Sequence, residues 1–168
     1  MKAVRVIADA KLSWDDMPTP APAAGEVLIK VQATAINRAD LMQRMGLYPP
    51  PPGASDVMGL ECAGTIAAVG DGVTRWKEGD EVCALLSGGG YAQFAVAPEG
   101  SVLPVPQGLT MAHAACLPEV FATAYLNMYI EANLQPGEKV ILHAGASGVG
   151  TAGIQLAKAF GNPSFVTA

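Results

Sequence analysis

Residues 138–150, Glu-Lys-Val-Ile-Leu-His-Ala-Gly-Ala-Ser-Gly-Val-Gly, decide how the last third of the chain folds. The apolar run 139–143 predicts a β-strand, and the glycine-rich turn after it opens a helix-patterned segment at 149–160. Glycines let the backbone turn tightly and approach a pyrophosphate, to which the next helix presents free N–H groups. The stretch therefore predicts the strand–turn–helix that begins a dinucleotide-binding unit, and a plain tight turn without a ligand is the alternative.

The turn itself supplies the candidate contacts to a pyrophosphate. They are Gly145, Ala146, Ser147, Gly148, Val149 and Gly150. The first and third glycines of the dinucleotide fingerprint fall on Gly145 and Gly150, whereas Ser147 replaces the middle one and adds a hydroxyl that could donate to phosphate. A second strand is predicted at 164–168. The residue that binds the adenosine ribose is expected about 20 residues after the first glycine, at the end of this strand. We therefore expect this chain to be the front part of a longer enzyme.

Composition narrows the class of protein. The chain is 51% hydrophobic and 15% charged, which favours a buried core over disorder. A net charge of -5 without a basic patch argues against nucleic acid as a partner. No apolar run approaches the roughly 20 residues that cross a bilayer, so we expect no membrane partner. Three scattered cysteines form no disulfide framework, and no signal peptide is seen, so we expect a cytoplasmic protein.

The first two thirds of the chain are rich in short predicted strands separated by turns. These strands are 1–7, 26–36, 60–69, 82–86 and 91–97. The pattern is typical of a small β-barrel or sandwich. Helices are predicted at 37–45, with Asn37 as N-cap, at 110–117, ended by Pro118, and at 119–132. We place a domain boundary here, between residues 1–117 and 118–168.

A series of motifs runs in one order through nearly all of the chain. They are Ala35-Ile-Asn-Arg-Ala-Asp-Leu-Met-Gln-Arg44, Pro50-Pro-Pro-Gly53, Gly59-Leu-Glu-Cys-Ala-Gly64, Trp76-Lys-Glu-Gly-Asp-Glu-Val82, Gly88-Gly-Gly-Tyr-Ala-Gln-Phe94 and His143-Ala-Gly-Ala-Ser-Gly-Val-Gly150. The series resembles the quinone oxidoreductase branch of the medium-chain dehydrogenase/reductase superfamily, and the turn is most similar to that of its p53-inducible group. The resemblance implies an α/β protein: a GroES-like catalytic β-barrel at 1–117, followed by the first β-α-β unit of an incomplete NADPH-binding Rossmann domain at 118–168.

The resemblance also implies an activity. NADPH would donate a hydride to a small-molecule quinone or another conjugated carbonyl, and the longer parent would be a homodimer. We expect this chain alone to be inactive. Two alternatives stay open: an enone or enoyl-thioester reductase of the same superfamily, and a non-catalytic binding fragment. The choice of NADPH over NADH depends on the residue that would bind the 2′-phosphate of the adenosine ribose, and this residue would follow residue 168.

The candidate metal ligands of the superfamily's zinc enzymes are replaced in this chain. Aligning the motifs puts Asn37 where a cysteine ligand would be and Leu60 where a histidine would be. An amide and an alkyl chain do not replace thiolate and imidazole. The structural zinc loop of four cysteines is reduced to Cys83. We therefore expect no metal.

Without zinc, another group must stabilise negative charge on the acceptor oxygen, and a tyrosine hydroxyl or an amide can do so. Tyr48, on a loop stiffened by four prolines, is the first candidate, and surface packing is its alternative role. Asn37 is the second candidate, for both acceptor and cofactor, and helix capping is its alternative. By resemblance Thr123 faces the nicotinamide, although it could simply fill an apolar helix.

Overall fold

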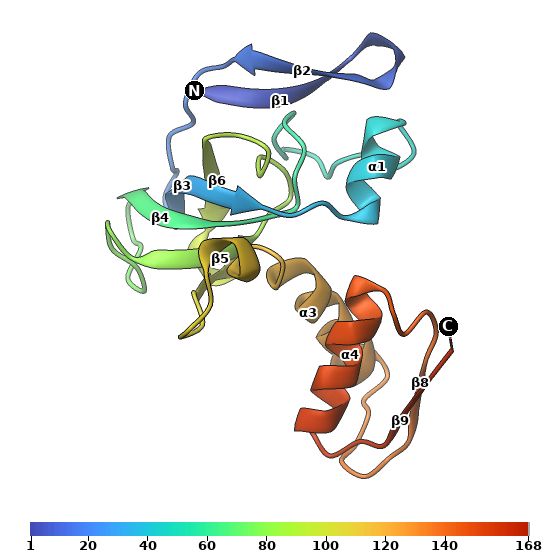
Figure 1. Ribbon diagram of the computed structural model, residues 1–168. Helices are drawn as coiled ribbons and strands as arrows, with labels where there is room; N and C mark the ends of the chain where they lie inside the picture. Colours follow the sequence, from blue (N-terminus) through green and yellow to red (C-terminus); the bar gives the residue numbers. More distant parts are fainter. Residues whose placement is uncertain (168) are drawn as a thin grey trace. The chain divides into compact units, whose positions relative to one another are not determined.

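The computed structural model describes residues 1–167 of the chain. The chain divides into two compact units, Met1–Pro118 and a second that begins at Glu119. Figure 1 shows the elements of each unit along the sequence. Ala168, the predicted end of the last strand, lies outside the described residues.

The first unit is built on a curled antiparallel sheet of five strands in the order β6-β3-β4-β5-β7. The strands are β3 (Glu26–Thr34), β4 (Glu61–Val69), β5 (Glu81–Leu85), β6 (Phe94–Pro98) and β7 (Val102–Pro104). Valine, isoleucine and cysteine side chains on one face form the core, since such residues pack well on a pleated surface. Two shifts of register between β3 and β4 bend the sheet. The predicted fold class, an α/β protein with a GroES-like β-barrel followed by the first β-α-β unit of an incomplete Rossmann domain, is confirmed, and the barrel is a curled half-barrel.

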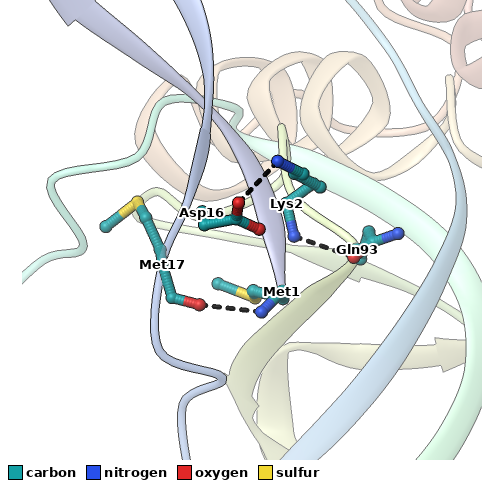
Figure 2. A network of polar contacts seen from close by, with 5 residues as sticks. All are labelled: Met1, Lys2, Asp16, Met17 and Gln93. Carbon is teal, nitrogen blue, oxygen red and sulfur yellow. Dashed lines mark hydrogen bonds and ion pairs between the residues drawn. The ribbon is translucent and has the colours of Figure 1, made fainter.

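A hairpin of β1 (Lys2–Ile7) and β2 (Lys11–Asp16) adds to the same unit. The sequence predicted β1 but not β2, because Lys-Leu-Ser-Trp-Asp-Asp is too polar to read as a strand. Figure 2 shows the polar contacts at the open end of the hairpin. The Lys2 ammonium lies 2.7 Å from Asp16, and the Lys2 N–H donates to the Gln93 side chain at 2.8 Å. The first of these bonds joins β1 to β2, and the second attaches the hairpin to the segment that leads into β6.

Two short helices complete the first unit, α1 (Arg38–Arg44) and α2 (Met111–Ala114). Asn37 is the N-cap of α1, as predicted. The helix predicted at 110–117 is shorter than expected: Thr110 caps α2 by accepting the N–H of His113 at 3.3 Å, and the helix ends after one turn.

The second unit contains α3 (Pro118–Tyr125, of which Pro118 is the last residue of the first unit), the π-helix η3 (Leu126–Glu131), β8 (Val140–Leu142), α4 (Gly148–Ala159) and β9 (Ser164–Val166). Strands β8 and β9 pair in parallel, joined by α4, as a β-α-β unit requires. Small side chains of α3 and α4 pack with Met128 in its core. No helix within residues 1–167 is long and apolar enough to cross a membrane.

The single helix predicted at 119–132 is wrong in two ways. Pro118 is the first residue of α3 instead of the end of a preceding helix, a position that suits proline because its missing N–H needs no partner there. The helix then widens into η3, where the Asn127 side-chain amide donates to the Thr123 carbonyl at 2.8 Å. The Ala132 N–H correspondingly reaches the Asn127 carbonyl, five residues back, at 3.0 Å.

Candidate functional site

The glycine turn, residues 144–150, leads from β8 into α4. Ser147 is the N-cap of α4, and its hydroxyl oxygen accepts the Gly150 N–H at 3.0 Å. The Ser147 N–H donates to the Ala144 carbonyl at 2.9 Å. The first N–H groups of a helix have no intrahelical acceptor, so those of Gly148 and Val149 are left for a ligand. An anion at this end of α4 would also meet the positive end of the helix dipole.

Gly150 permits a close approach that no other residue would allow. A Cβ atom added there would lie 2.4 Å from the Ala144 carbonyl oxygen and 2.8 Å from the Gly145 backbone. These are backbone atoms, so they cannot move aside as a side chain can. Gly145 and Gly150 are buried, whereas residues 146–149 are exposed. Gly145 and Gly150, at the two ends of the turn, are thus packed against the protein, and residues 146–149 between them face solvent. This arrangement suits the binding of a pyrophosphate.

Two details of the turn were not foreseen. Ser147 is a helix cap, so its oxygen is already an acceptor and only its hydroxyl hydrogen is available to a phosphate. Ala144 has a φ of 55°, in the left-handed region that costs a residue with a Cβ atom about 1–2 kcal/mol. A non-glycine residue held in this conformation stores strain at the start of the turn.

A second group of polar residues lies in the first unit, and we call Asn37, Asp40, Glu61 and Tyr91 the Asn37 network. The Asn37 side-chain Nδ2 donates to Glu61 Oε1 at 2.8 Å, and its backbone N–H donates to Asp40 Oδ2 at 2.7 Å. The Tyr91 hydroxyl donates to the same Asp40 oxygen at 2.8 Å. Helix α1, strand β4 and the loop before β6 therefore meet at Asn37.

Both carboxylates of the network are buried, with Asp40 2% and Glu61 1% exposed. Buried charges require hydrogen-bonded partners, and the network supplies them. Burial, together with the hydrogen bond to Asp40, raises the pKa of Tyr91 well above its usual range, so its hydroxyl stays a donor. Asp40 Oδ1 has no hydrogen-bond partner within residues 1–167, so one carboxylate oxygen carries both bonds.

Gly59 and Gly90 bring the segments of the network together. A Cβ atom on Gly90 would lie 2.8 Å from the Glu61 carbonyl oxygen, and one on Gly59 would lie 2.6 Å from the Tyr91 nitrogen. The Gly90 N–H donates to the Gly59 carbonyl at 3.1 Å. The two glycine motifs recognised in the sequence thus place Glu61 and Tyr91 on adjoining backbone segments.

The other predicted site residues lie outside this network. Tyr48 is 44% exposed on the loop after α1, and the described part of the chain gives its hydroxyl no hydrogen bond. In the second unit, the Thr123 hydroxyl lies 3.3 Å from a Glu119 carboxylate oxygen, so it does not bond back to the helix carbonyls. The structure brings Asn37 together with Asp40 and Glu61, but it does not bring Tyr48 into the network.

A cavity of about 670 Å³ lies beside the network in the first unit. Its walls are apolar side chains from the hairpin, β3 and α1, among them Val4, Trp14, Val31 and Leu41. Asp40 and Tyr91 line it, whereas neither Asn37 nor Tyr48 does. The cavity therefore does not coincide with the predicted acceptor site.

The metal-ligating residue types are scattered. No group of three or more His, Cys, Asp or Glu side chains that could hold a metal ion occurs within residues 1–167. Cys62 and Cys83 belong to different core clusters, and burial raises the pKa of Cys62 to about 12. The His143 ring lies 3.1 Å from the Thr167 hydroxyl, at the ends of β8 and β9.

Sequence reasoning missed three members of the network as site residues. Asp40, Glu61 and Tyr91 each lie in a motif quoted above, but none of them was predicted to be a site residue. The signal for Asp40 was available, because Asn37 and Asp40 have the spacing of a capping box, which the structure confirms. No local pattern links Glu61 or Tyr91 to Asn37, since they lie 24 and 54 residues away along the chain.

The chain is similar to known proteins over nearly its whole length. The alcohol dehydrogenase GroES-like domain family matches residues 23–107. Quinone oxidoreductase of Rattus norvegicus is 36% identical over 166 residues, which cover 96% of this chain and 50% of that protein.

Solved structures are similar in fold as well as in sequence. The CurK enoyl reductase has a TM-score of 0.89 at 35% identity, over 99% of this chain and 54% of that one. The quinone oxidoreductase of Thermus thermophilus, solved also in complex with NADPH, has a TM-score of 0.80 at 34% identity, over 99% and 52%. The chain thus spans about half the length of these relatives.

Proposed function

Because the chain belongs to the alcohol dehydrogenase GroES-like domain family of medium-chain dehydrogenases and reductases, we propose that its parent protein reduces quinones with NADPH and without zinc. The observation that carries the proposal is the glycine turn. The N–H groups of Gly148 and Val149 at the start of α4 are free to bind a ligand, and Gly150 packs directly against the backbone of Ala144 and Gly145. From the likeness of its turn, Ala-Gly-Ala-Ser-Gly-Val-Gly, we also propose that the protein belongs to the p53-inducible group. We further propose a cytoplasmic homodimer.

The cofactor residues follow from the turn. The N–H groups of Gly148 and Val149 and the Ser147 hydroxyl hydrogen would hold the pyrophosphate of NADPH. Thr123 is our candidate for the nicotinamide side, on the strength of the resemblance. When bound, the nicotinamide supplies a hydride, and the protein's own groups orient the acceptor and exclude water.

The acceptor would be bound by neutral donors. Hydride addition to a quinone leaves negative charge on an oxygen, and a fixed N–H or O–H group stabilises that charge. Asn37 offers an amide, and Tyr48 offers an exposed phenol on a loop that prolines hold at little entropic cost. Asn37 and Leu60 at the ligand positions support the proposal that no zinc takes this role.

A second candidate function is the reduction of enones or enoyl thioesters. The similarity to the CurK enoyl reductase favours it, because the same hydride chemistry serves both acceptors. A comparison of turnover with benzoquinone and with a crotonyl thioester decides between the two acceptors.

The experiment that tests the cofactor site is an NADPH titration of the natural polypeptide that contains this chain. Gly150→Val should abolish binding, because its Cβ atom alone would lie 2.4 Å from a backbone oxygen. Gly153→Ala is the matched control in the same helix: its Cβ atom would meet only the Leu142 and Met128 side chains, at 3.1 Å or more. Unchanged affinity in Gly150→Val would refute the site.

A further inference from the structure

The orientation of the Asn37 amide is set by Glu61. The amide nitrogen donates to Glu61 Oε1 at 2.8 Å, whereas the Asp40 N–H donates to the Asn37 backbone carbonyl at 3.1 Å. A carboxylate accepts hydrogen bonds and does not donate them. The atom that Asn37 turns to Glu61 must therefore be Nδ2, which fixes the side-chain oxygen on the other side.

We propose that Glu61 is a positioning residue, which holds the Asn37 amide so that the second N–H of Nδ2 is the group presented to the acceptor. The proposal rests on the function proposed above, in which Asn37 binds the acceptor oxygen. It assigns Glu61 a role through Asn37 and not through contact with substrate.

Glu61 is placed where it can hold another side chain still. It is the first residue of β4, it is 1% exposed, and its carbonyl accepts the Thr34 hydroxyl at 2.7 Å. The Gly90 backbone packs directly against that carbonyl. A group supported by packed strands keeps its geometry better than one supported by a loop.

The backbone of Asn37 is fixed independently of its side chain. Asp40 accepts the Asn37 N–H at 2.7 Å, and the Tyr91 hydroxyl holds the same Asp40 oxygen at 2.8 Å. Asp40 thus fixes the position of the Asn37 backbone, and Glu61 fixes the orientation of the Asn37 side-chain amide. A donor that needs no reorganisation during the reaction stabilises the transition state best.

Two substitutions at Glu61 distinguish the effect of its hydrogen bond with Asn37 from the effect of its charge. Glu61→Gln keeps an oxygen that can accept from Nδ2, whereas Glu61→Leu keeps the size of the side chain and removes every acceptor. In the 168-residue chain, nuclear magnetic resonance should show a scalar coupling across the hydrogen bond from Asn37 Nδ2 to the Glu61 carboxyl carbon. In Glu61→Gln the coupling should persist, now to the side-chain amide carbon of the glutamine. In Glu61→Leu it should be lost. Absence of the coupling in the unsubstituted chain would refute the orientation.

Turnover of a quinone by the natural polypeptide then tests the role. Loss of one oxyanion donor costs about 10²–10³-fold in kcat, and for an easily reduced quinone we expect the low end or less in Asn37→Ala. Glu61→Leu should approach the loss of kcat seen in Asn37→Ala, and Glu61→Gln should stay near wild type. The double variant Asn37→Ala/Glu61→Leu should be no slower than Asn37→Ala alone.

The outcomes distinguish the two proposals. If Asn37→Ala lowers kcat but Glu61→Leu does not, or if the two losses multiply in the double variant, the positioning role is refuted while the proposed function stands. If Asn37→Ala leaves kcat unchanged, both the donor role of Asn37 and the positioning role of Glu61 are refuted.

Discussion

The glycine turn and the Asn37 network hold polar groups in opposite ways. The turn uses contiguous residues, and the groups it offers are backbone N–H groups at the exposed start of α4. The network uses buried and half-buried side chains from three separate segments around one amide. The turn therefore depends on the absence of side chains, whereas the network depends on each side chain that it contains. Substitutions should consequently affect the two regions differently.

The largest effect is expected where the network depends on close backbone packing. Gly90→Ala would place a Cβ atom 2.8 Å from the Glu61 carbonyl oxygen, a backbone atom, so we expect the upper end of the overpacking cost, about 3 kcal/mol. Urea unfolding followed by tryptophan fluorescence reports on this unit, because Trp14 and Trp76 both lie in it. Gly100→Ala is the control, since no atom lies within 4 Å of its added Cβ. Equal midpoints would show that the packing is looser than described.

Removing one hydroxyl tests the polar side of the same network. Tyr91→Phe deletes the donor to Asp40 and leaves that carboxylate buried with one bond fewer, which should lower the free energy of unfolding by about 2 kcal/mol. Tyr48→Phe, at an exposed phenol, should change it by less than about 0.5 kcal/mol. The same urea experiment compares the two variants, and the reverse ranking would contradict the account of both tyrosines.

Alkaline pH should weaken the first unit. Burial raises the pKa of Cys62 to about 12, whereas an unfolded thiol titrates near about 8.5. Above that pH the unfolded state loses its proton first, so the free energy of unfolding should fall by up to about 1.4 kcal/mol per pH unit until pH reaches the folded pKa. The contribution is fully present below the unfolded pKa. Cys62→Ala should flatten this slope between the unfolded and the folded pKa, and an unchanged slope would exclude Cys62 as its cause.

The smallest effect is expected in the glycine turn, and its sign is opposite. Ala144→Gly removes a Cβ atom from a left-handed backbone conformation, so it should stabilise the turn by up to about 1 kcal/mol. Ala146→Gly, at a residue without a positive φ, should destabilise it by about 0.5–1 kcal/mol. Amide hydrogen exchange in α4 measures both. Faster exchange in Ala144→Gly would show that the turn is not strained.

The same contrast explains what the sequence could predict. The glycine turn and the start of α1 at Asn37 are local patterns, so each could be recognised from neighbouring residues. The Asn37 network could not, because a hydrogen bond between residues 24 or 51 positions apart leaves no periodic signal. Strand β2 was missed because its residues are mostly polar, and no residue pattern marks the π-helix. Tertiary contacts decided the Asn37 network and the pairing of β2.

The rate of NADPH oxidation in the presence of benzoquinone, measured on metal-depleted natural polypeptide, tests the central claim most directly. The account predicts quinone-dependent oxidation that needs no added zinc, that Gly150→Val abolishes and that Gly153→Ala retains. An absence of quinone-dependent oxidation, a requirement for zinc, or equal rates in wild type and Gly150→Val would contradict it.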